Sequence, residues 1–295
     1  MKHCLFSISY AGLWGQGRLD LLDFIDRAAE LGYDGVMIAG KRPHLSPLDA
    51  TAARLREVRA RLERAGVECL VIGGYTDFSG TAPPMVPVPE MQIAYVESLA
   101  RIAAEVGAKY VRVFSGYEKE GEPLIHVWQR VVASLQECAD RAAVHGVTLA
   151  VQNHHDIGVC TEAMAELIAD VGRDNCRLGF DAWSVALRGE DVYQAAQRMA
   201  PQAVITTNAD YVRIPRARYR PDLENYQVME PPLVKAVPFG DGSIDYEAFF
   251  RGLRDGGFDG VATYEMCAPL RGGGSMENLD RCARRYLEWM RARGM

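Results

Sequence analysis

The chain has 295 residues, of which 48% are hydrophobic and 24% charged, a composition typical of a globular protein in water. Its formal net charge of -6 gives no general electrostatic attraction to nucleic acid. It contains no run of about 18 apolar residues, so we expect no membrane-spanning helix. The N-terminal residues lack the cleavage pattern of a signal peptide and are expected to form a first strand.

The seven cysteines are odd in number and form no C-x-x-C pair. This pattern predicts free thiols in a reducing compartment, and we therefore expect a cytoplasmic protein. Cys267 differs from the others because it follows Glu265 by two residues, close to a candidate site.

Strand-like and helix-like segments alternate along the chain. The predicted strands cover residues 4–9, 36–39, 67–72, 110–114, 147–152, 177–181, 203–208 and 260–265. The predicted helices, several of them followed by a terminating glycine, cover residues 19–31, 48–65, 90–106, 122–145, 162–171, 190–200, 245–255 and 276–293. The third strand is followed by a long proline-rich loop of the kind that is more often functional than idle, with Pro83, Pro84, Pro87 and Pro89.

Eight strand–helix units in a chain of this length predict an α/β fold, the (β/α)8 TIM barrel, as a single domain of residues 1–295. The competing fold is an open doubly wound sheet, which would have a glycine-rich phosphate loop after its first strand. Residues 12–17 (Gly-Leu-Trp-Gly-Gln-Gly) do not match the GxGxxG pattern of that loop, which favours the barrel.

Polar side chains end four predicted strands in the second half of the chain: Gln152, Asp181, the pair Thr207-Asn208, and Glu265. Because the C-terminal ends of barrel strands meet on one face, we expect these side chains to surround one cavity. Asp181 and Glu265 each complete an apolar strand, where a carboxylate is costly unless it is paired or bound to metal. Carboxylate and amide oxygens suit Mg²⁺ and Mn²⁺, so the pattern predicts a divalent metal site. The alternative is that Lys, Arg or backbone N–H groups satisfy both carboxylates.

Other polar residues near strand ends are candidates for catalysis and substrate binding. The neutral amide of Gln152 could bind the metal or only hydrogen-bond a substrate hydroxyl. His154 and His155 lie just beyond it, after Asn153, and we expect one of them to have a catalytic role, although a histidine in such a loop is more often a structural hydrogen-bonding group. Lys41 and His44 follow the second strand and are candidate substrate-binding residues.

Two loops have side chains suited to an anionic or sugar substrate. Residues 211–236 alternate arginines, Arg218 among them, with tyrosines, which suits a carboxylate, a phosphate or a sugar ring. The alternative is a solvated loop or a contact in a homo-oligomer. Arg271, with Gly272-Gly273-Gly274 at a helix start, could hold an anion, or the glycines could make a turn and Ser275 cap the helix.

The chain resembles the sugar-phosphate isomerase/epimerase family with the xylose isomerase-like barrel. The resemblance covers nearly the whole length. It is carried by Leu-Gly-Tyr-Asp-Gly at 31–35, Leu-Ala-Val-Gln-Asn-His at 149–154, Gly-Phe-Asp at 179–181, residues 237–246, and Gly-Gly-Phe-Asp-Gly at 256–260 leading to Tyr264-Glu265. It implies a divalent cation, often Mn²⁺, Mg²⁺ or Co²⁺, held by Glu, Asp, His and Glu at the ends of strands five to eight.

This chain matches that implied ligand set in part. Asp181 and Glu265 match the Asp and the second Glu, whereas Gln152 replaces the first Glu. The histidine of strand seven is replaced by Thr207 or Asn208, depending on register, so Asn208 is a candidate ligand and Thr207 a candidate substrate contact. Ser184 stands where the family has a substrate-binding histidine.

These departures bear on the reaction, because the resemblance implies two glutamates that move a proton through an enediolate. A glutamine cannot accept that proton, which leaves Glu265 and a nearby histidine. The first hypothesis is a metal-dependent isomerase or epimerase acting on a sugar, keto-sugar or cyclitol. The second is a lyase or dehydratase of the same fold acting on a keto-glycoside or polyol acid, and the third is a sugar-binding barrel without turnover. The expected partner is a small carbohydrate, with no nucleic acid and no membrane.

Overall fold

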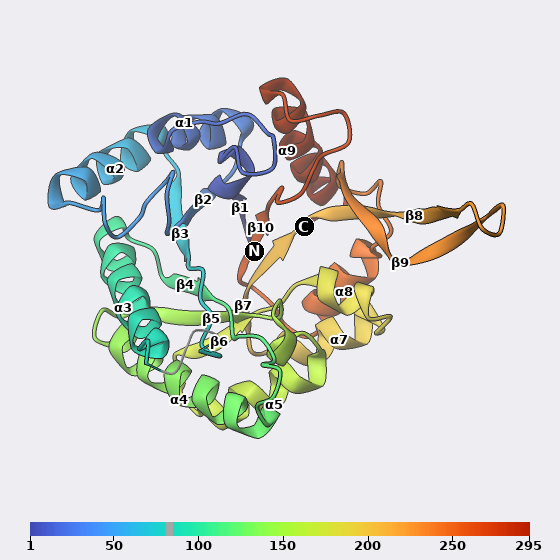
Figure 1. Ribbon diagram of the computed structural model, residues 1–295. Helices are drawn as coiled ribbons and strands as arrows, with labels where there is room; N and C mark the ends of the chain where they lie inside the picture. The colour runs from blue at the N-terminus through green and yellow to red at the C-terminus, as the bar shows by residue number, and fades with distance from the viewer. Residues whose placement is uncertain (81–84) are drawn as a thin grey trace.

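The computed structural model describes residues 1–80 and 85–295 and contains a closed barrel of eight parallel strands with helices around it (Figure 1). In order around the barrel, the strands are β1 (Lys2–Phe6), β10 (Val261–Tyr264), β7 (Ala203–Asn208), β6 (Cys176–Gly179), β5 (Thr148–Gln152), β4 (Tyr110–Val113), β3 (Glu68–Gly73) and β2 (Gly35–Ala39). The predicted (β/α)8 fold is confirmed.

The helices that follow the strands form the outer layer (Figure 1). They are α1 (Leu21–Leu31), α2 (Ala52–Ala65), α3 (Val88–Val106), α4 (Leu124–Ala143), α5 (Thr161–Val171), α7 (Val192–Met199), α8 (Tyr246–Asp255) and α9 (Met276–Arg291). Helix α1 shows why they begin and end where they do, since the Asp20 side chain accepts from the N–H groups of Leu22 and Asp23, and Gly32 ends the helix at φ 85°. None of the helices in the described part of the chain is long and apolar enough to span a membrane.

Two hydrophobic cores hold these layers together. The larger one lies between the strands and the helices, and the smaller one fills the barrel with Phe6, Met37, Ala150 and Ile205 among its members. Both result from the alternation of side chains along a strand, which sends neighbouring residues to opposite faces. The smaller core supports the residues at the C-terminal ends of the strands, where barrel enzymes have their active sites.

The structure corrects the predicted elements at several places. The first strand ends at Phe6, and residues 7–10 form a short 3₁₀ helix. A short helix that was not predicted, α6 (Ala182–Leu187), begins directly after Asp181. Helix α3 begins at Val88, before the predicted start, because Pro89 is compatible with a first helical turn. The predicted loop residues Pro83 and Pro84 lie outside the described residues.

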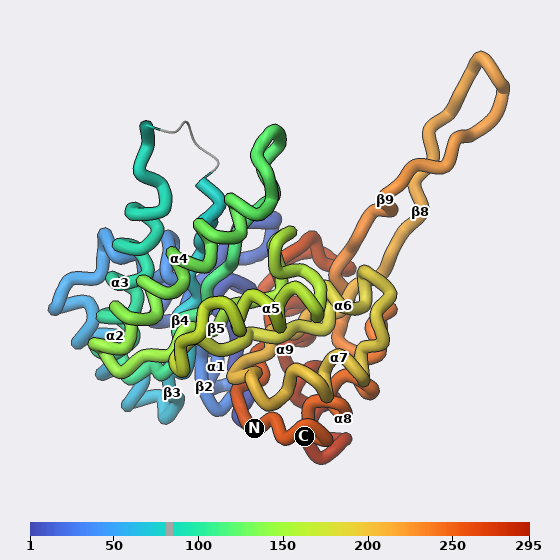
Figure 2. Tube along the Cα trace, turned by 90° about the horizontal axis from the view of Figure 1, so that it is seen from below, coloured from blue at the N-terminus to red at the C-terminus, as the bar shows by residue number. Residues whose placement is uncertain are grey.

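Residues 211–236, expected as a loop, instead form most of an antiparallel ribbon of β8 (Asp210–Arg220) and β9 (Asn225–Val237). Figure 2 shows this ribbon leaving the barrel and extending far beyond the helices. An exposed ribbon tolerates the charges and prolines of this segment because most of its side chains face solvent.

Candidate active site

A cavity of about 230 Å³ lies at the C-terminal ends of β5, β6, β7 and β10. Its polar lining includes Gln152, His154, Asp181, Thr207 and Glu265. A larger hollow of about 430 Å³ lies at the opposite end of the barrel, where α2 and α3 end and β3 begins. Because catalytic groups of TIM barrels lie at the C-terminal face, we take the smaller cavity as the candidate active site.

Asp181 is held from two neighbouring strands. Its Oδ1 accepts a 2.7 Å hydrogen bond from the backbone N–H of Thr207, and its Oδ2 accepts from the amide of Gln152. Asn153 fixes the backbone at the same point, since it donates to the Asp181 carbonyl at 3.0 Å and accepts from the Asp181 N–H at 2.7 Å. These contacts set the position of the carboxylate before any ligand binds.

Burial makes both cavity carboxyl groups weaker acids. The pKa of Asp181 is raised to about 8, first because burial penalises its charged form and second because Glu265 lies nearby. Burial also raises the pKa of Glu265, while the positive charge of Arg112 opposes that rise. Two carboxyl groups that repel each other in a buried cavity favour a cation or a proton held between them.

Arg112 is a residue of this region that the sequence reasoning missed. It lies on β4, is 2% exposed, and donates to the carbonyl of Gly74 at 2.8 Å. Its guanidinium carbon lies 4.1 Å from the ring centre of Phe114 and 4.9 Å from that of Tyr75. The sequence feature that could have revealed it is an arginine inside the apolar strand Tyr110–Val113, because a charge buried there needs compensation.

The cavity has an aromatic wall beside the carboxylates. The rings of Trp183 and Tyr211 lie 4.4 Å apart, and both residues line the cavity. The Tyr211 hydroxyl is 3.1 Å from the sulfur of Cys267, which in turn donates to Glu265 Oε1 at 3.5 Å. Such a wall suits the apolar face of a sugar ring, and the thiol and hydroxyl orient the Glu265 carboxylate.

The two candidate histidines have different environments. His154 lines the cavity, so it can meet a substrate there. His155 is packed between the rings of Phe114 and Tyr117, at 4.5 and 4.1 Å, with its Nε2 atom 3.0 Å from the Tyr117 hydroxyl. Burial lowers the pKa of His155 to about 4. His155 therefore supports the wall behind the site and is not brought to the cavity.

The structure decides which residue of strand seven faces the cavity, and it is Thr207. The Asn208 side chain is buried on the other side of the strand, where it donates to the carbonyls of Thr206 and Thr263 at 3.3 and 3.1 Å. The expectation that Asn208 is a metal ligand is corrected, because successive side chains of a strand point to opposite faces.

Three further candidates for substrate binding lie away from the cavity lining. Ser184 is buried on α6, and His44 is buried with its ring 6.1 Å from Phe24 of α1. The ammonium of Lys41 lies 3.5 Å above the ring centre of Tyr75. Of these three, only Lys41 touches the aromatic and arginine cluster beside the site.

The two arginines of the candidate loops are also not brought to the cavity. Arg218 is exposed on the ribbon of β8 and β9, outside the barrel. Arg271 is exposed in a turn whose carbonyls accept from Asn278 at 3.0 Å (Arg271) and 2.6 Å (Gly273). Ser275 caps α9 by accepting from the Asn278 N–H. The turn-and-cap alternative accounts for this segment.

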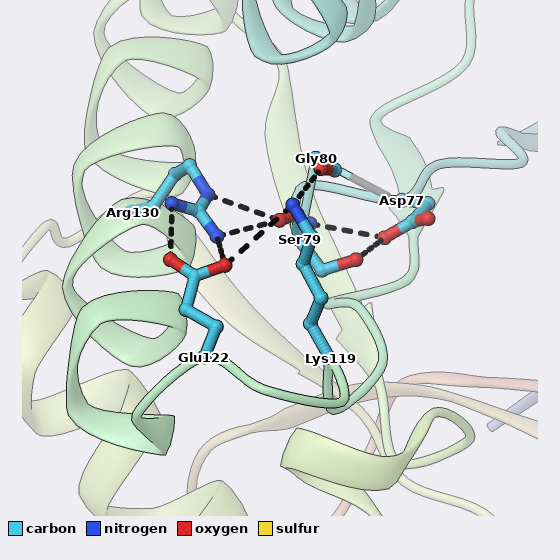
Figure 3. A network of polar contacts seen from close by, with 6 residues as sticks. All are labelled: Asp77, Ser79, Gly80, Lys119, Glu122 and Arg130. Carbon is cyan, nitrogen blue, oxygen red and sulfur yellow. Dashed lines mark hydrogen bonds and ion pairs between the residues drawn. The ribbon is translucent and has the colours of Figure 1, made fainter. Parts of the chain in front are cut away.

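A polar network joins two loops near the C-terminal face (Figure 3). Arg130 of α4 donates to the carbonyl of Ser79 at 3.0 and 2.7 Å and pairs with Glu122 at 3.0 Å. Lys119 donates to the carbonyl of Gly80 at 3.1 Å. The network ties the loop after β3 to the loop after β4, beside the cluster of Tyr75, Arg112 and Phe114.

The donor set of the cavity can be tested against a metal ion. No three His, Cys, Asp or Glu side chains come together as a metal-binding group within residues 1–80 and 85–295. The cavity nevertheless combines two carboxylates with Gln152 Oε1 and Thr207 Oγ1, which are buried and have no hydrogen-bond partner among the described residues. A carboxylate has about four acceptor positions, so Asp181 retains free lone pairs. This all-oxygen set fits a hard cation such as Mg²⁺ or Mn²⁺.

Comparisons with known proteins agree on the fold. The model of a family described as "xylose isomerase-like TIM barrel" matches residues 25–293. No curated protein matches the chain by sequence.

Solved structures are similar over almost the whole length. The probable 3-DHS dehydratase AsbF of Bacillus anthracis has 18% identity and a TM-score of 0.73, and 98% of this chain and 99% of that chain are covered. D-psicose 3-epimerase of Clostridium cellulolyticum H10 has 16% identity and a TM-score of 0.75, with 99% of each chain covered. The zinc-binding IolI protein has 18% identity and a TM-score of 0.73, with 97% and 96% covered. At these identities the likeness shows the fold alone.

Proposed function

Because the chain belongs to the xylose isomerase-like TIM barrel family, we propose that it is an isomerase or epimerase of a small sugar, keto-sugar or cyclitol that uses a divalent cation. The observation that carries the proposal is the pair Asp181 and Glu265 in one cavity with an aromatic wall. The cavity volume of about 230 Å³ lies below the usual range for small-molecule sites, about 300–1,000 Å³, which favours a monosaccharide over a longer glycan.

Asp181, Glu265, Gln152 and Thr207 would hold the cation, with Mn²⁺, Mg²⁺ or Co²⁺ as the expected ions. A bound cation would polarise a substrate carbonyl and so make the neighbouring carbon–hydrogen bond more acidic. Asn153 and the Thr207 N–H keep Asp181 in place. Trp183 and Tyr211 would position the sugar ring against the carboxylates.

Glu265 is the proposed base. Its carboxylate takes the proton from the carbon next to the substrate carbonyl and leaves an enediolate, and Glu265 or His154 returns a proton to carbon. Return to the neighbouring carbon, with the hydroxyl proton passing from one oxygen of the enediolate to the other, gives isomerisation, and return to the other face of the same carbon gives epimerisation. Gln152 cannot serve as the second base, because its amide has no proton-accepting lone pair of useful basicity and donates to Asp181.

A lyase or dehydratase is the second candidate, and the amide of Gln152 favours it. Elimination needs one base to remove the proton beside the carbonyl while a hydroxyl or glycosidic oxygen leaves from the next carbon with the electron pair. Glu265 suffices for that step, and one relative with this fold is a probable dehydratase.

Incubating a panel of ketoses and keto-sugars in D₂O with Mn²⁺ separates the reaction classes by NMR. A saturated product with deuterium on carbon supports the isomerase or epimerase, and an unsaturated product supports the lyase. Binding of a sugar without any turnover would instead identify a sugar-binding barrel and contradict both enzyme proposals.

The Glu265→Gln variant tests the base. It keeps the size of the side chain but cannot accept the proton, so turnover should fall by about 10²–10⁴-fold. The matched control is Glu68→Gln, at the opposite end of the barrel, where Glu68 pairs with Lys2 at 2.5 Å. Equal turnover of Glu265→Gln and wild type would refute the role of Glu265.

Metal content tests the cofactor separately. We expect wild-type protein to bind Mn²⁺ or Mg²⁺ in calorimetry, Asp181→Asn to bind at least tenfold more weakly, and chelation to abolish turnover. Full activity after exhaustive chelation would contradict a metal-dependent reaction.

A further inference from the structure

The ribbon of β8 and β9, here called the arm, forms a two-stranded sheet separate from the barrel. Ten residue pairs join its strands, from Asp210 with Val237 to Arg220 with Asn225. With about 3.4 Å per residue, the eleven residues of β8 reach about 35 Å, which is comparable to the width of a domain. Figures 1 and 2 show the arm pointing away from the barrel, with no other segment along most of its length.

The outer half of the arm has one apolar face and one basic face. Tyr219 lies opposite Tyr226, with ring centres 5.4 Å apart, and Ala217 lies opposite Val228. Directly opposed residues share a face, so these four form the apolar face. The alternate positions place Arg216, Arg218 and Arg220 on the other face.

The apolar face is open to solvent. Tyr219, Tyr226 and Val228 are 54%, 68% and 72% exposed, and Leu223 at the tip is 66% exposed. A two-stranded ribbon by itself is at best marginally stable in water, and both of its strand edges can pair or pack with another chain. An extended arm with such a face is therefore suited to contact with another chain.

The charge of the arm differs from that of the rest of the chain. Residues 211–236 contain five basic and three acidic residues, whereas the remainder contains 28 basic and 36 acidic residues. A basic arm on an acidic body is electrostatically complementary to another copy of the same body.

A matching surface lies between α4 and α5. A hollow of about 610 Å³ there has a mainly apolar floor that includes Leu124, Ile125 and Trp128, and the first two are 49% and 57% exposed. Three acidic residues border it, namely Glu162, Glu166 and Asp170. The apolar floor suits the apolar face of the arm, and the acidic border suits the net positive charge of the arm.

The arm cannot serve its own hollow, because it points away from the barrel while α4 and α5 lie elsewhere around the rim (Figure 1). We propose that the arm of each copy docks in the α4–α5 hollow of a second copy, so that two reciprocal contacts form a closed dimer with twofold symmetry. This assembly does not depend on the reaction proposed above.

Sedimentation analysis of the full chain tests the dimer. We expect wild-type protein to be dimeric at micromolar concentrations. Val228→Glu on the arm and Ile125→Glu in the hollow should each weaken association at least tenfold, because each places a charge in the apolar contact. Both sites are exposed, so circular dichroism should show an unchanged fold.

Val144→Glu is the matched control, since Val144 is 83% exposed at the other end of α4, away from the hollow. This variant should remain dimeric. A monomeric wild-type protein would overturn the proposal, whether its arm proves to bind nucleic acid, another protein or nothing. A dimer that resists either the arm or the hollow substitution would overturn it as well.

Discussion

Single buried charges set the character of the site, and Arg112 is the clearest case. Its guanidinium lies in the barrel beside two carboxyl groups whose pKa values are raised by burial. Arg112→Met should destabilise the fold by about 3 kcal/mol at pH 7, because it leaves the buried carbonyl of Gly74 without its donor and removes the positive charge that favours the ionised form of Glu265. Urea unfolding with a chelator present would measure this. The control is Arg177→Met. Arg177 lies on β6 and donates to the Pro201 carbonyl at an exposed position, so its loss should cost about 1 kcal/mol of stability. An equal loss of stability in both variants would contradict the role of burial.

His44 should make the fold sensitive to mild acid. Burial lowers its pKa to about 4 in the folded protein, whereas an unfolded histidine has a pKa of about 6.5. Between pH 4 and pH 6.5 the unfolded chain therefore binds more protons than the folded protein. The contribution of His44 to the free energy of unfolding is fully present above pH 6.5 and is lost as the pH falls toward 4. At pH 5 the loss is about 2 kcal/mol. His44→Phe should remove this contribution to the difference between the free energies of unfolding at pH 7 and pH 5. An unchanged difference in the variant would refute the role of His44.

At the scale of elements, the site depends on how the ends of β5 and β6 are joined. Asn153 makes two hydrogen bonds with the backbone of Asp181, at 3.0 and 2.7 Å. Asn153→Ala should cost about 2 kcal/mol of stability, because it leaves buried backbone groups unpaired, and should also weaken binding of Mn²⁺.

Asn175→Ala provides the comparison for Asn153. Asn175 also bonds backbone carbonyls, those of Ala139 and Val147 at 2.7 and 3.3 Å, but at the N-terminal end of the barrel strands. It should lose similar stability in urea unfolding and keep metal binding. Equal metal affinity in the two variants would show that Asn153 does not position Asp181.

At the scale of the whole molecule, the reciprocal arms should link stability to assembly. Because a dimer is stabilised by mass action, the thermal midpoint of wild-type protein should rise with protein concentration. A variant in which Asn-Gly replaces residues 214–233 joins the opposed residues Arg213 and Val234 by a two-residue turn. Its midpoint in differential scanning calorimetry should not depend on concentration, and a persistent dependence would contradict the arm-mediated contact.

Sequence patterns predicted the alternating elements and the barrel because each depends on local periodicity and on helix-terminating glycines. Asp181 and Glu265 could be singled out because a carboxylate at the end of an apolar strand needs a partner. The arm was taken for a loop, since pairing across a long ribbon is not visible in local pattern. The short helix α6 was missed because its six residues are too few to show a period.

The sequence by itself determined the order of strands and helices, the closed fold that they form, and the two acidic residues of the candidate site. Only the tertiary structure decided that Thr207 and not Asn208 faces the cavity, that Gln152 bonds Asp181, and that Arg112 lies beside both carboxyl groups. The reason is physical. Periodicity depends on residues that are neighbours in the chain. Which strand residue faces the cavity, and which charges surround a buried carboxyl group, depend on segments that are distant in sequence and meet only when the barrel closes.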